Sequence, residues 1–247
     1  MICSIIIGRK GSKGFPGKNY IKIFGLSLFE YPILASFKSK NVDKVFLATD
    51  CPVIIKKSNK YKKRGLNYIK RPKALNNDKA LGDDVFKFCY DKIKKKYTNN
   101  LEFIVLLFAN APNINAEMID KGVDFLRKNK SFDSIVSVSQ YNMWSPLRAR
   151  KLNNKGELIP FVPFRHFSNN KNLNCDRDSQ GNVYFADMSL SVVRSRCLED
   201  MKNNLLPQRW MGKKIAPLFC AAGADIDYEW QIPQAKYCIQ KLNNGKQ

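Results

Sequence analysis

The sequence predicts an α/β fold with three layers, in which helices cover both faces of a mostly parallel, Rossmann-like sheet. Apolar runs rich in β-branched residues alternate along the chain with stretches of helical length. The first of these runs leads directly into a glycine-rich loop. With 247 residues, of which 44% are hydrophobic, the chain is long enough to bury a full core. We therefore expect one domain over residues 1–247.

The expected elements follow one another in a regular order. The first strand begins at Ile2, where five of the six residues in the run ICSIII are apolar, a pattern typical of a strand buried on both faces. Shorter apolar runs predict further strands at 45–48, 66–69, 103–107 and 134–138. Stretches of helical length between them predict helices around 29–39, 53–63, 84–96 and 116–128. Such alternation is typical of parallel strands joined by helices.

The pattern changes after Ser139, which indicates an insertion. Short runs at 148–152 and 158–164 are separated by Asn-Asn-Lys-Gly, a plausible hairpin turn. A polar loop at 168–181 precedes another expected strand at 182–186. We interpret residues from about 141 to 178 as an inserted arm, and we expect the last helix at 229–242.

A cationic loop follows the first expected strand. Residues 8–19 read GRKGSKGFPGKN and place four glycines among four cations. Glycine frees the backbone to wrap a ligand, and successive N–H groups form an anion-binding nest. The spacing is not that of a P-loop, since Gly11 lies one residue too far from Gly17 and Asn19 replaces the hydroxyl residue, and it is not GxGxxG. The loop predicts a triphosphate site, with a flexible basic turn as the alternative.

This loop resembles the strand-ARxGSKGxPxKN motif of the cytidylyltransferases that activate acidic sugars, the CMP-sialic acid and CMP-Kdo synthetases. The resemblance implies an α/β fold of the nucleotide-diphospho-sugar transferase type, with an inserted dimerisation arm. It assigns nucleotide binding to Arg9, Gly11, Ser12, Lys13, Lys18 and Asn19. Arg9 and Lys18 are expected to be catalytic because they hold the phosphates of CTP.

A second motif lies near the end of the chain. Asp225 and Asp227 form a D-x-D, and residues two apart in an extended segment share one face, so both carboxylates can meet one hard cation. The alternative is a helix N-cap with a solvated neighbour, since Asp227 precedes an expected helix. The run DIDYEW resembles the D-I-D stretch before the last helix of the same family. The resemblance implies that Asp225 and Asp227 are catalytic ligands of Mg²⁺.

Other matches to the family lie between these ends. Arg71, in Arg-Pro, is expected to contact cytosine. Arg148 and Arg165 match stretches whose cations face the acidic sugar, and Tyr184 matches a strand beside it. For both arginines, surface salt bridging is the alternative. The family's L-Q-x-T-S-P is replaced here by LFANAP, in which Asn110 is the expected substrate-binding residue.

Composition limits the other functional classes. A net charge of +22 suggests a nucleic-acid partner, but the lysine clusters fall on expected exposed helix faces without a recognisable nucleic-acid module, so we expect none. No apolar run has the roughly 18 residues of a membrane span, and charges begin at Arg9, which disfavours a secretory signal. The seven cysteines are scattered, as expected for reduced packing residues. We expect a soluble, cytoplasmic protein without a membrane partner.

Together, the residues and the resemblance predict an enzyme that transfers CMP from CTP to an acidic 2-keto-3-deoxy sugar and releases pyrophosphate. Its expected cofactor is Mg²⁺, and the resemblance implies a homodimer in which the arm packs on a second subunit. Three alternatives remain at this point: a metal-dependent glycosyltransferase that uses a nucleotide-sugar, a non-catalytic basic nucleic-acid-binding protein, and an inactive homologue.

Overall fold

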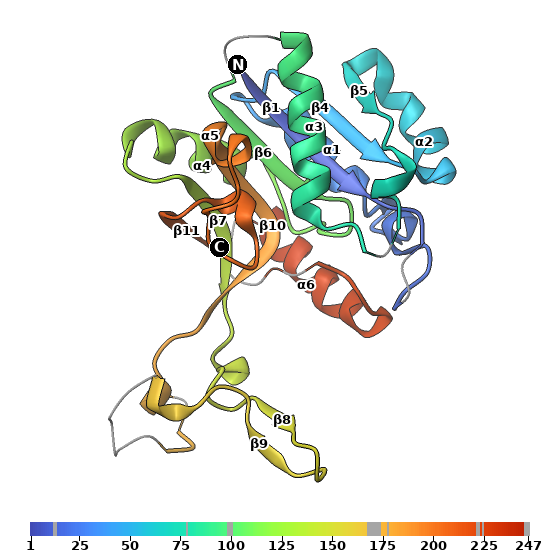
Figure 1. Cartoon of the computed structure of the whole chain (residues 1–247). Helices are drawn as coiled ribbons and strands as arrows, with labels where there is room; N and C mark the ends of the chain where they lie inside the picture. The colour runs from blue at the N-terminus through green and yellow to red at the C-terminus, as the bar shows by residue number, and fades with distance from the viewer. Residues whose placement is uncertain are drawn as a thin grey trace.

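The computed structural model (Figure 1) describes residues 1–11, 14–77, 79–97, 101–166, 174–176, 178–220, 223 and 225–244. Seven strands form its main sheet in the order β11-β7-β10-β6-β1-β4-β5. Their bounds are β1 Ile2–Gly8, β4 Lys44–Thr49, β5 Leu66–Ile69, β6 Phe103–Phe108, β7 Ser134–Gln140, β10 Tyr184–Arg194 and β11 Ile215–Cys220. Neighbouring strands are parallel except that β10 runs antiparallel to β6 and β7. The mostly parallel sheet predicted from the sequence is confirmed.

Helices cover both faces of this sheet. They are α1 Glu30–Lys38, α2 Pro52–Ser58, α3 Gly82–Tyr97, α4 Ala116–Lys128, α5 Arg196–Glu199 and α6 Ile232–Asn243. Strand β1 explains the need for two layers, because Ile2 and Ile6 pack into the core with α1 and α4, whereas Cys3 and Ile5 pack into the core with α3 and α5. A strand buried on both faces gains from apolar side chains at every position. The three-layer prediction is therefore confirmed.

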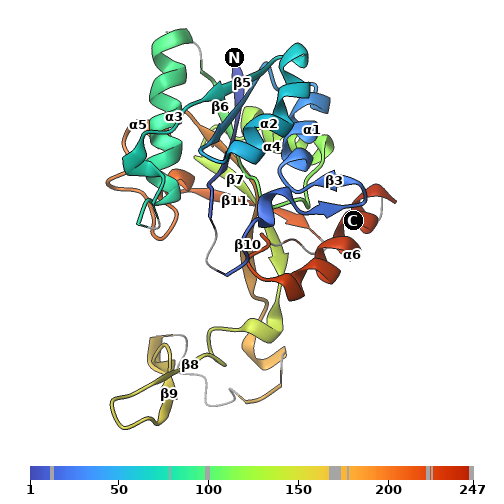
Figure 2. The same cartoon turned by 90° about the vertical axis from the view of Figure 1, so that its right-hand side faces the viewer.

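A smaller cluster joins the two ends of the chain. The hairpin of β2 (Lys22–Ile23) and β3 (Leu26–Ser27) follows the glycine-rich loop, and α6 packs near it (Figure 2). The buried residues of this cluster are Ile23, Leu28, Ile226, Ala235 and Ile239. Apolar burial therefore fixes the segment before α6 against the loop after β1.

Two strands of the main sheet, β10 and β11, differ most from the sequence prediction. Strand β10 reaches Arg194, far beyond the expected 182–186, because a register shift between Ala186 and Ser191 and a positive φ of 60° at Met188 break the alternation of side chains. Strand β11 was not predicted, since Pro217 argues against a strand. It lies at the edge of the sheet, where proline is tolerated.

The arm leaves the sheet after β7 and returns at β10, projecting away from the body (Figures 1 and 2). Its hairpin consists of β8 (Arg150–Leu152) and β9 (Leu158–Pro160), shorter than the expected runs. Leu152 and Leu158 are cross-strand partners and are 68% and 70% exposed. The arm thus presents apolar side chains to its surroundings. Among the described residues, no helix combines the length and apolarity needed to cross a membrane.

Candidate active site

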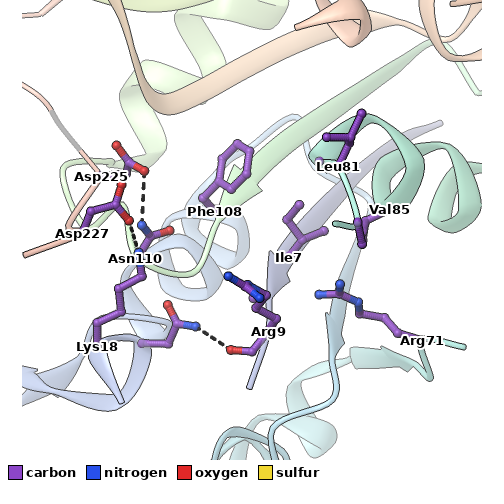
Figure 3. Close-up of a pocket in the computed structure, with 14 residues that line it drawn as sticks. Ile7, Arg9, Lys18, Arg71, Leu81, Val85, Phe108, Asn110, Asp225 and Asp227 are labelled. Atoms are coloured by element: carbon purple, nitrogen blue, oxygen red, sulfur yellow. Dashed lines mark hydrogen bonds and ion pairs between the residues drawn. The ribbon is translucent and has the colours of Figure 1, made fainter. Parts of the chain in front are cut away.

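A pocket of about 260 Å³ lies where β1 and β6 end (Figure 3). In open α/β sheets, the carboxyl ends of parallel strands form the usual ligand crevice. The polar lining residues are Arg9, Lys18, Asn19, Arg71, Asn110, Asp225 and Asp227. The structure therefore brings together in one cavity residues that the sequence analysis took from both ends of the chain.

Gly8 allows the two strands to approach each other at the pocket floor. A Cβ at this position would lie 2.5 Å from Cβ of Ala109 and 3.3 Å from Nδ2 of Asn19. Across the same contact, the Ala109 N–H donates to the Ile7 carbonyl at 2.8 Å. Asn19 Nδ2 also donates to the Arg9 carbonyl at 3.2 Å. Glycine and asparagine therefore fix the start of the cationic loop.

The loop contacts the carboxyl-terminal segment directly. Lys18 forms an ion pair with Asp227, and Figure 3 shows its side chain extending to that carboxylate. The Lys18 side chain is 11% exposed and that of Asp227 is 53% exposed. A Cβ at Gly14 would lie 2.9 Å from the Asp227 carbonyl oxygen, so the backbones also pack closely.

Asp225 is the more buried of the two acids. Asn110 Nδ2 donates to its Oδ2 at 3.3 Å and to the Ile226 carbonyl at 3.1 Å. Burial raises the pKa of Asp225 above its ordinary value, and the Asp227 charge adds to this effect, whereas Lys18 and the hydrogen bond from Asn110 oppose it. Two close carboxylates, one of them desolvated, are better stabilised when a further cation joins Lys18.

The donor set fits Mg²⁺ shared with a phosphate ligand. No cluster of three or more His, Cys, Asp or Glu side chains with metal-binding geometry occurs in the described part of the chain. Mg²⁺ is often held by one or two carboxylates together with substrate phosphates. Asp225 and Asp227 supply such a pair beside Lys18. The acids therefore suit a cation that arrives with a polyphosphate rather than a permanent structural metal.

Arg71 enters the pocket from the opposite wall (Figure 3). It is only 6% exposed, and its Nη2 donates to the Leu75 carbonyl, whereas its buried Nε has no partner within the described structure. Burial lowers the pKa of Arg71, and the charge of Arg9 acts in the same direction. A buried guanidinium with an unused donor favours a polar or anionic ligand.

An apolar wall, which was not predicted from the sequence, lies between these polar groups. It consists of Ile7, Ala80, Leu81, Val85 and Phe108, with Gly82 beside them. Phe108 packs edge-on against Phe86 with ring centroids 5.3 Å apart, so its position is well supported. Apolar residues at the ends of strands and helices form no recognisable sequence motif, so a pattern search does not find them. The only available signal was the replacement of the family's Gln by Phe108.

The remaining predicted site residues lie elsewhere or outside the described residues. Gly11 lines an adjoining cavity of about 210 Å³ that also includes Arg9 and Lys18. Ser12 and Lys13 fall outside the described residues.

The three predicted sugar-binding residues of the arm region do not line the central pocket. Arg148 lines a separate cavity of the arm, and its Nη2 donates to the Cys175 carbonyl at 2.8 Å. Arg165 is exposed on a short 3-10 helix of the arm. Tyr184 packs edge-on against Phe219 at 5.3 Å, at the root of the arm. Within one chain, the predicted phosphate and metal residues converge, whereas these three remain apart from them.

Solved structures share this fold. A CMP:2-keto-3-deoxy-manno-octonic acid synthetase complexed with CTP is similar with a TM-score of 0.64 and 15% identity, covering 98% of this chain and 99% of the other. The 4-diphosphocytidyl-2C-methyl-D-erythritol synthase of Anaerococcus prevotii has a TM-score of 0.60 and 12% identity, covering 97% and 96%. At these identities, the likeness concerns the fold.

Curated relatives are similar in sequence. N-acylneuraminate cytidylyltransferase of Streptococcus agalactiae is 31% identical over 168 residues, covering 65% of this chain and 37% of the relative. A Helicobacter pylori protein named pseudaminic acid cytidylyltransferase and UDP-2,4-diacetamido-2,4,6-trideoxy-beta-L-altropyranose hydrolase is 25% identical over 168 residues, covering 68% and 31%. The matches therefore span about a third of these two relatives. Pseudaminic acid cytidylyltransferase of Campylobacter jejuni is 26% identical over 182 residues, covering 73% and 76%.

A match to a family model gives the most direct evidence of the family to which the chain belongs. The model of the family described as Cytidylyltransferase matches residues 3–155, more than half of the chain, and includes the cationic loop, Arg71 and Asn110. These comparisons favour a cytidylyltransferase over the glycosyltransferase and nucleic-acid-binding alternatives. The chain therefore belongs to the cytidylyltransferase family of nucleotidyltransferases.

Proposed function

We propose that the protein transfers CMP from CTP to a sugar acid of the ulosonic class and releases pyrophosphate. The observation that carries this proposal is the convergence of three cations and two carboxylates in one pocket. A triphosphate has nearly four negative charges, which Arg9 and Lys18 can face within a partly enclosed space, while Arg71 lies on the opposite wall. The relatives named for pseudaminic and N-acylneuraminic acid support an acidic sugar as acceptor.

In this mechanism, the apolar wall and Arg71 receive the cytosine ring, while Arg9 and Lys18 hold the phosphates. Asp225 and Asp227 would hold Mg²⁺, which when bound neutralises charge on the departing pyrophosphate. The sugar hydroxyl attacks the α-phosphorus in line, so that a sugar O–P bond forms and the Pα–O–Pβ bond breaks. Asp225 and Asp227 are the acids among the described lining residues, so either carboxylate could accept the hydroxyl proton.

We further propose that the arm acts in a homodimer. Its exposed apolar side chains would be covered by a second copy of the chain, and this contact would bring Arg148 and Arg165 toward the partner's pocket. The separation of these arginines from the central pocket of their own chain supports this arrangement. Each arginine would then bind the sugar carboxylate, for which the guanidinium geometry is well suited.

A substrate panel tests the proposed reaction. The protein is incubated with CTP, Mg²⁺ and each of several eight- and nine-carbon ulosonic acids, and pyrophosphate is followed. We expect pyrophosphate release that requires both CTP and one or more of the acids. If a nucleotide-sugar is consumed instead, while CTP is left intact with every acid, the glycosyltransferase alternative replaces this proposal.

A further inference from the structure

Asp187 is a buried acid that the proposed mechanism does not use. It lies in the irregular part of β10, where the register shifts between Ala186 and Ser191 and Met188 adopts a φ of 60°. Asp187 is only 5% exposed. A positive φ in a residue other than glycine is strained, and such strain persists only where the surroundings hold it. The irregularity of β10 is therefore a stable feature of the fold, and it places Asp187 inside the protein.

Neighbouring hydroxyl groups satisfy the Asp187 carboxylate. Ser137 Oγ donates to Oδ1, and Ser139 Oγ donates to Oδ2 at 2.7 Å. The Ser189 N–H adds a third hydrogen bond at 3.0 Å. Both serine hydroxyls come from β7, the strand that leads into the arm, whereas Asp187 is on β10, the strand that returns from it. The carboxylate thus ties together the two strands at the base of the arm.

The same carboxylate supports the segment that precedes the catalytic acids. A Cβ at Gly223 would lie 2.5 Å from Asp187 Oδ2 and 3.0 Å from Ser189 Oγ. The backbone of Gly223 therefore rests directly on the Asp187 side chain, and a larger residue cannot occupy this position without movement. Gly223 lies two residues before Asp225 in the chain.

A second residue of the arm base holds Gly223 from another direction. Tyr141, at the start of the arm, donates from its hydroxyl to the Gly223 carbonyl at 3.0 Å. Gln234 of α6 in turn donates to the Tyr141 oxygen at 2.9 Å. Gly223 is thus fixed by residues at both roots of the arm, one where the chain leaves the sheet and one where it returns.

We infer that Tyr141 and Asp187 are positioning residues, which set the place of Asp225 and Asp227 by clamping Gly223 at the base of the arm. This inference rests on the proposed function, because it assigns those two acids to a divalent cation. It also means that any displacement of the arm roots is transmitted to the carboxylates of the site. We therefore expect changes at these residues to weaken divalent-cation binding more than they destabilise the fold.

A mutant cycle between Asp187 and Gly223 tests the clamp. Gly223→Ala should weaken Mn²⁺ binding in the presence of CTP, measured by electron paramagnetic resonance, by about 10- to 100-fold, the range typical of groups that orient metal ligands. Asp187→Ala should weaken it less, and the double variant Asp187→Ala/Gly223→Ala should bind better than Gly223→Ala, because the collision has been removed. Tyr141→Phe should weaken Mn²⁺ binding several-fold. Ser36→Ala, which removes another buried serine hydroxyl pair with Ser4, should leave it unchanged.

The outcomes separate the clamp from a general loss of structure. If the effects of Asp187→Ala and Gly223→Ala simply multiply, or if folded variants bind Mn²⁺ as the wild type does, the inference is wrong. Ser139→Ala provides a milder variant should Asp187→Ala not fold. Wild-type protein that binds no Mn²⁺ with CTP and releases no pyrophosphate would instead contradict the proposed function itself.

Discussion

Lys18 and Asp227 form an ion pair across 209 positions of the sequence. Lys18 belongs to the glycine-rich loop and Asp227 precedes the last helix, so their contact brings the two ends of the chain into one site. The cluster of Ile23, Leu28 and Ile226 packs beneath this contact and fixes it by apolar burial. Both side chains line the pocket, so we attribute the pairing to the function of the pocket.

Replacing Asp225 with Asn should abolish most of the activity without lowering the stability of the protein. Burial and the charge of Asp227 raise the pKa of Asp225, so the folded protein favours the protonated carboxyl. The resulting stabilisation is fully present below the unfolded-state pKa of about 3.9 and is lost as pH rises through the folded-state pKa. At pH 7 without Mg²⁺, Asp225→Asn should therefore unfold at the same or a higher temperature than the wild type. Pyrophosphate release should fall at least about 100-fold. Glu117→Gln, on the exposed side of α4, is the control for activity and should leave pyrophosphate release unchanged.

Replacing Lys18 with Met should weaken CTP binding. A charge-assisted hydrogen bond contributes about 1.5–3 kcal/mol, so the apparent KM for CTP should rise roughly 10- to 100-fold. The exposed Lys22 of β2 offers a matched control, and Lys22→Met should leave KM unchanged. Titration calorimetry with CTP checks both variants, and equal affinities for the two would remove Lys18 from the phosphate site.

The charged half of the site could be predicted from sequence because each group belongs to a short ordered motif. The glycine spacing after Ile2 predicts an anion nest, whereas D-x-D alone also fits a helix N-cap, and it is the family resemblance that favours a cation site. Asp187 has no such signal, since its partners Ser137 and Ser139 lie 50 and 48 positions away. Its burial also depends on an irregularity of β10 that interrupts the expected alternation. Long-range satisfaction of a polar group cannot be deduced from local pattern.

Glu30 gives a pH-dependent prediction for the fold. Burial alone would raise its pKa, but hydrogen bonds from Lys60, Tyr61 and the Ser27 N–H outweigh burial and lower it. The distances are 2.5 Å to Lys60 Nζ, 2.6 Å to Tyr61 Oη and 2.8 Å to the Ser27 nitrogen. A lowered pKa means stability that is present above the unfolded-state value of about 4.3 and lost as pH falls through the folded-state pKa.

We therefore expect Glu30→Gln to lower the free energy of unfolding by about 1–3 kcal/mol at pH 7. The difference from the wild type should shrink as pH falls below about 4, because both proteins then carry a neutral side chain at this position. Urea unfolding at several pH values measures it. A difference that stays constant down to the lowest pH at which both proteins fold would argue against an ionised Glu30.

The arm hairpin predicts a test of the oligomeric state. Leu152 and Leu158 form an exposed apolar pair, and charging both should prevent another copy from covering them. Leu152→Lys/Leu158→Lys should convert a dimer into a monomer in sedimentation velocity, with turnover reduced because Arg148 and Arg165 no longer reach a partner's pocket. Leu205→Lys, at a half-exposed leucine on the body, should not change the sedimentation coefficient. A monomeric wild-type protein with full turnover would contradict the role proposed for the arm.

The arm contains predicted sugar-binding residues whose position relative to the pocket could not be predicted from the sequence. Arg148 and Arg165 match family stretches, but one chain holds them away from the pocket, and the role proposed for them depends on a contact between chains. The two helical layers, by contrast, could be anticipated, since β1 is mostly apolar and must be covered on both faces. Burial within a chain leaves a pattern in its sequence, whereas the geometry of an assembly leaves a weaker one.

Label transfer from CTP tests the central claim most directly. The protein is incubated with Mg²⁺, an ulosonic acid accepted in the substrate panel, and CTP labelled at either the α- or the γ-phosphate. We predict that the α-label appears in a new CMP-sugar and the γ-label in pyrophosphate, with both transfers lost in Asp225→Asn. Appearance of the γ-label in free phosphate or in the sugar, or transfer that does not depend on the acid, would contradict the account.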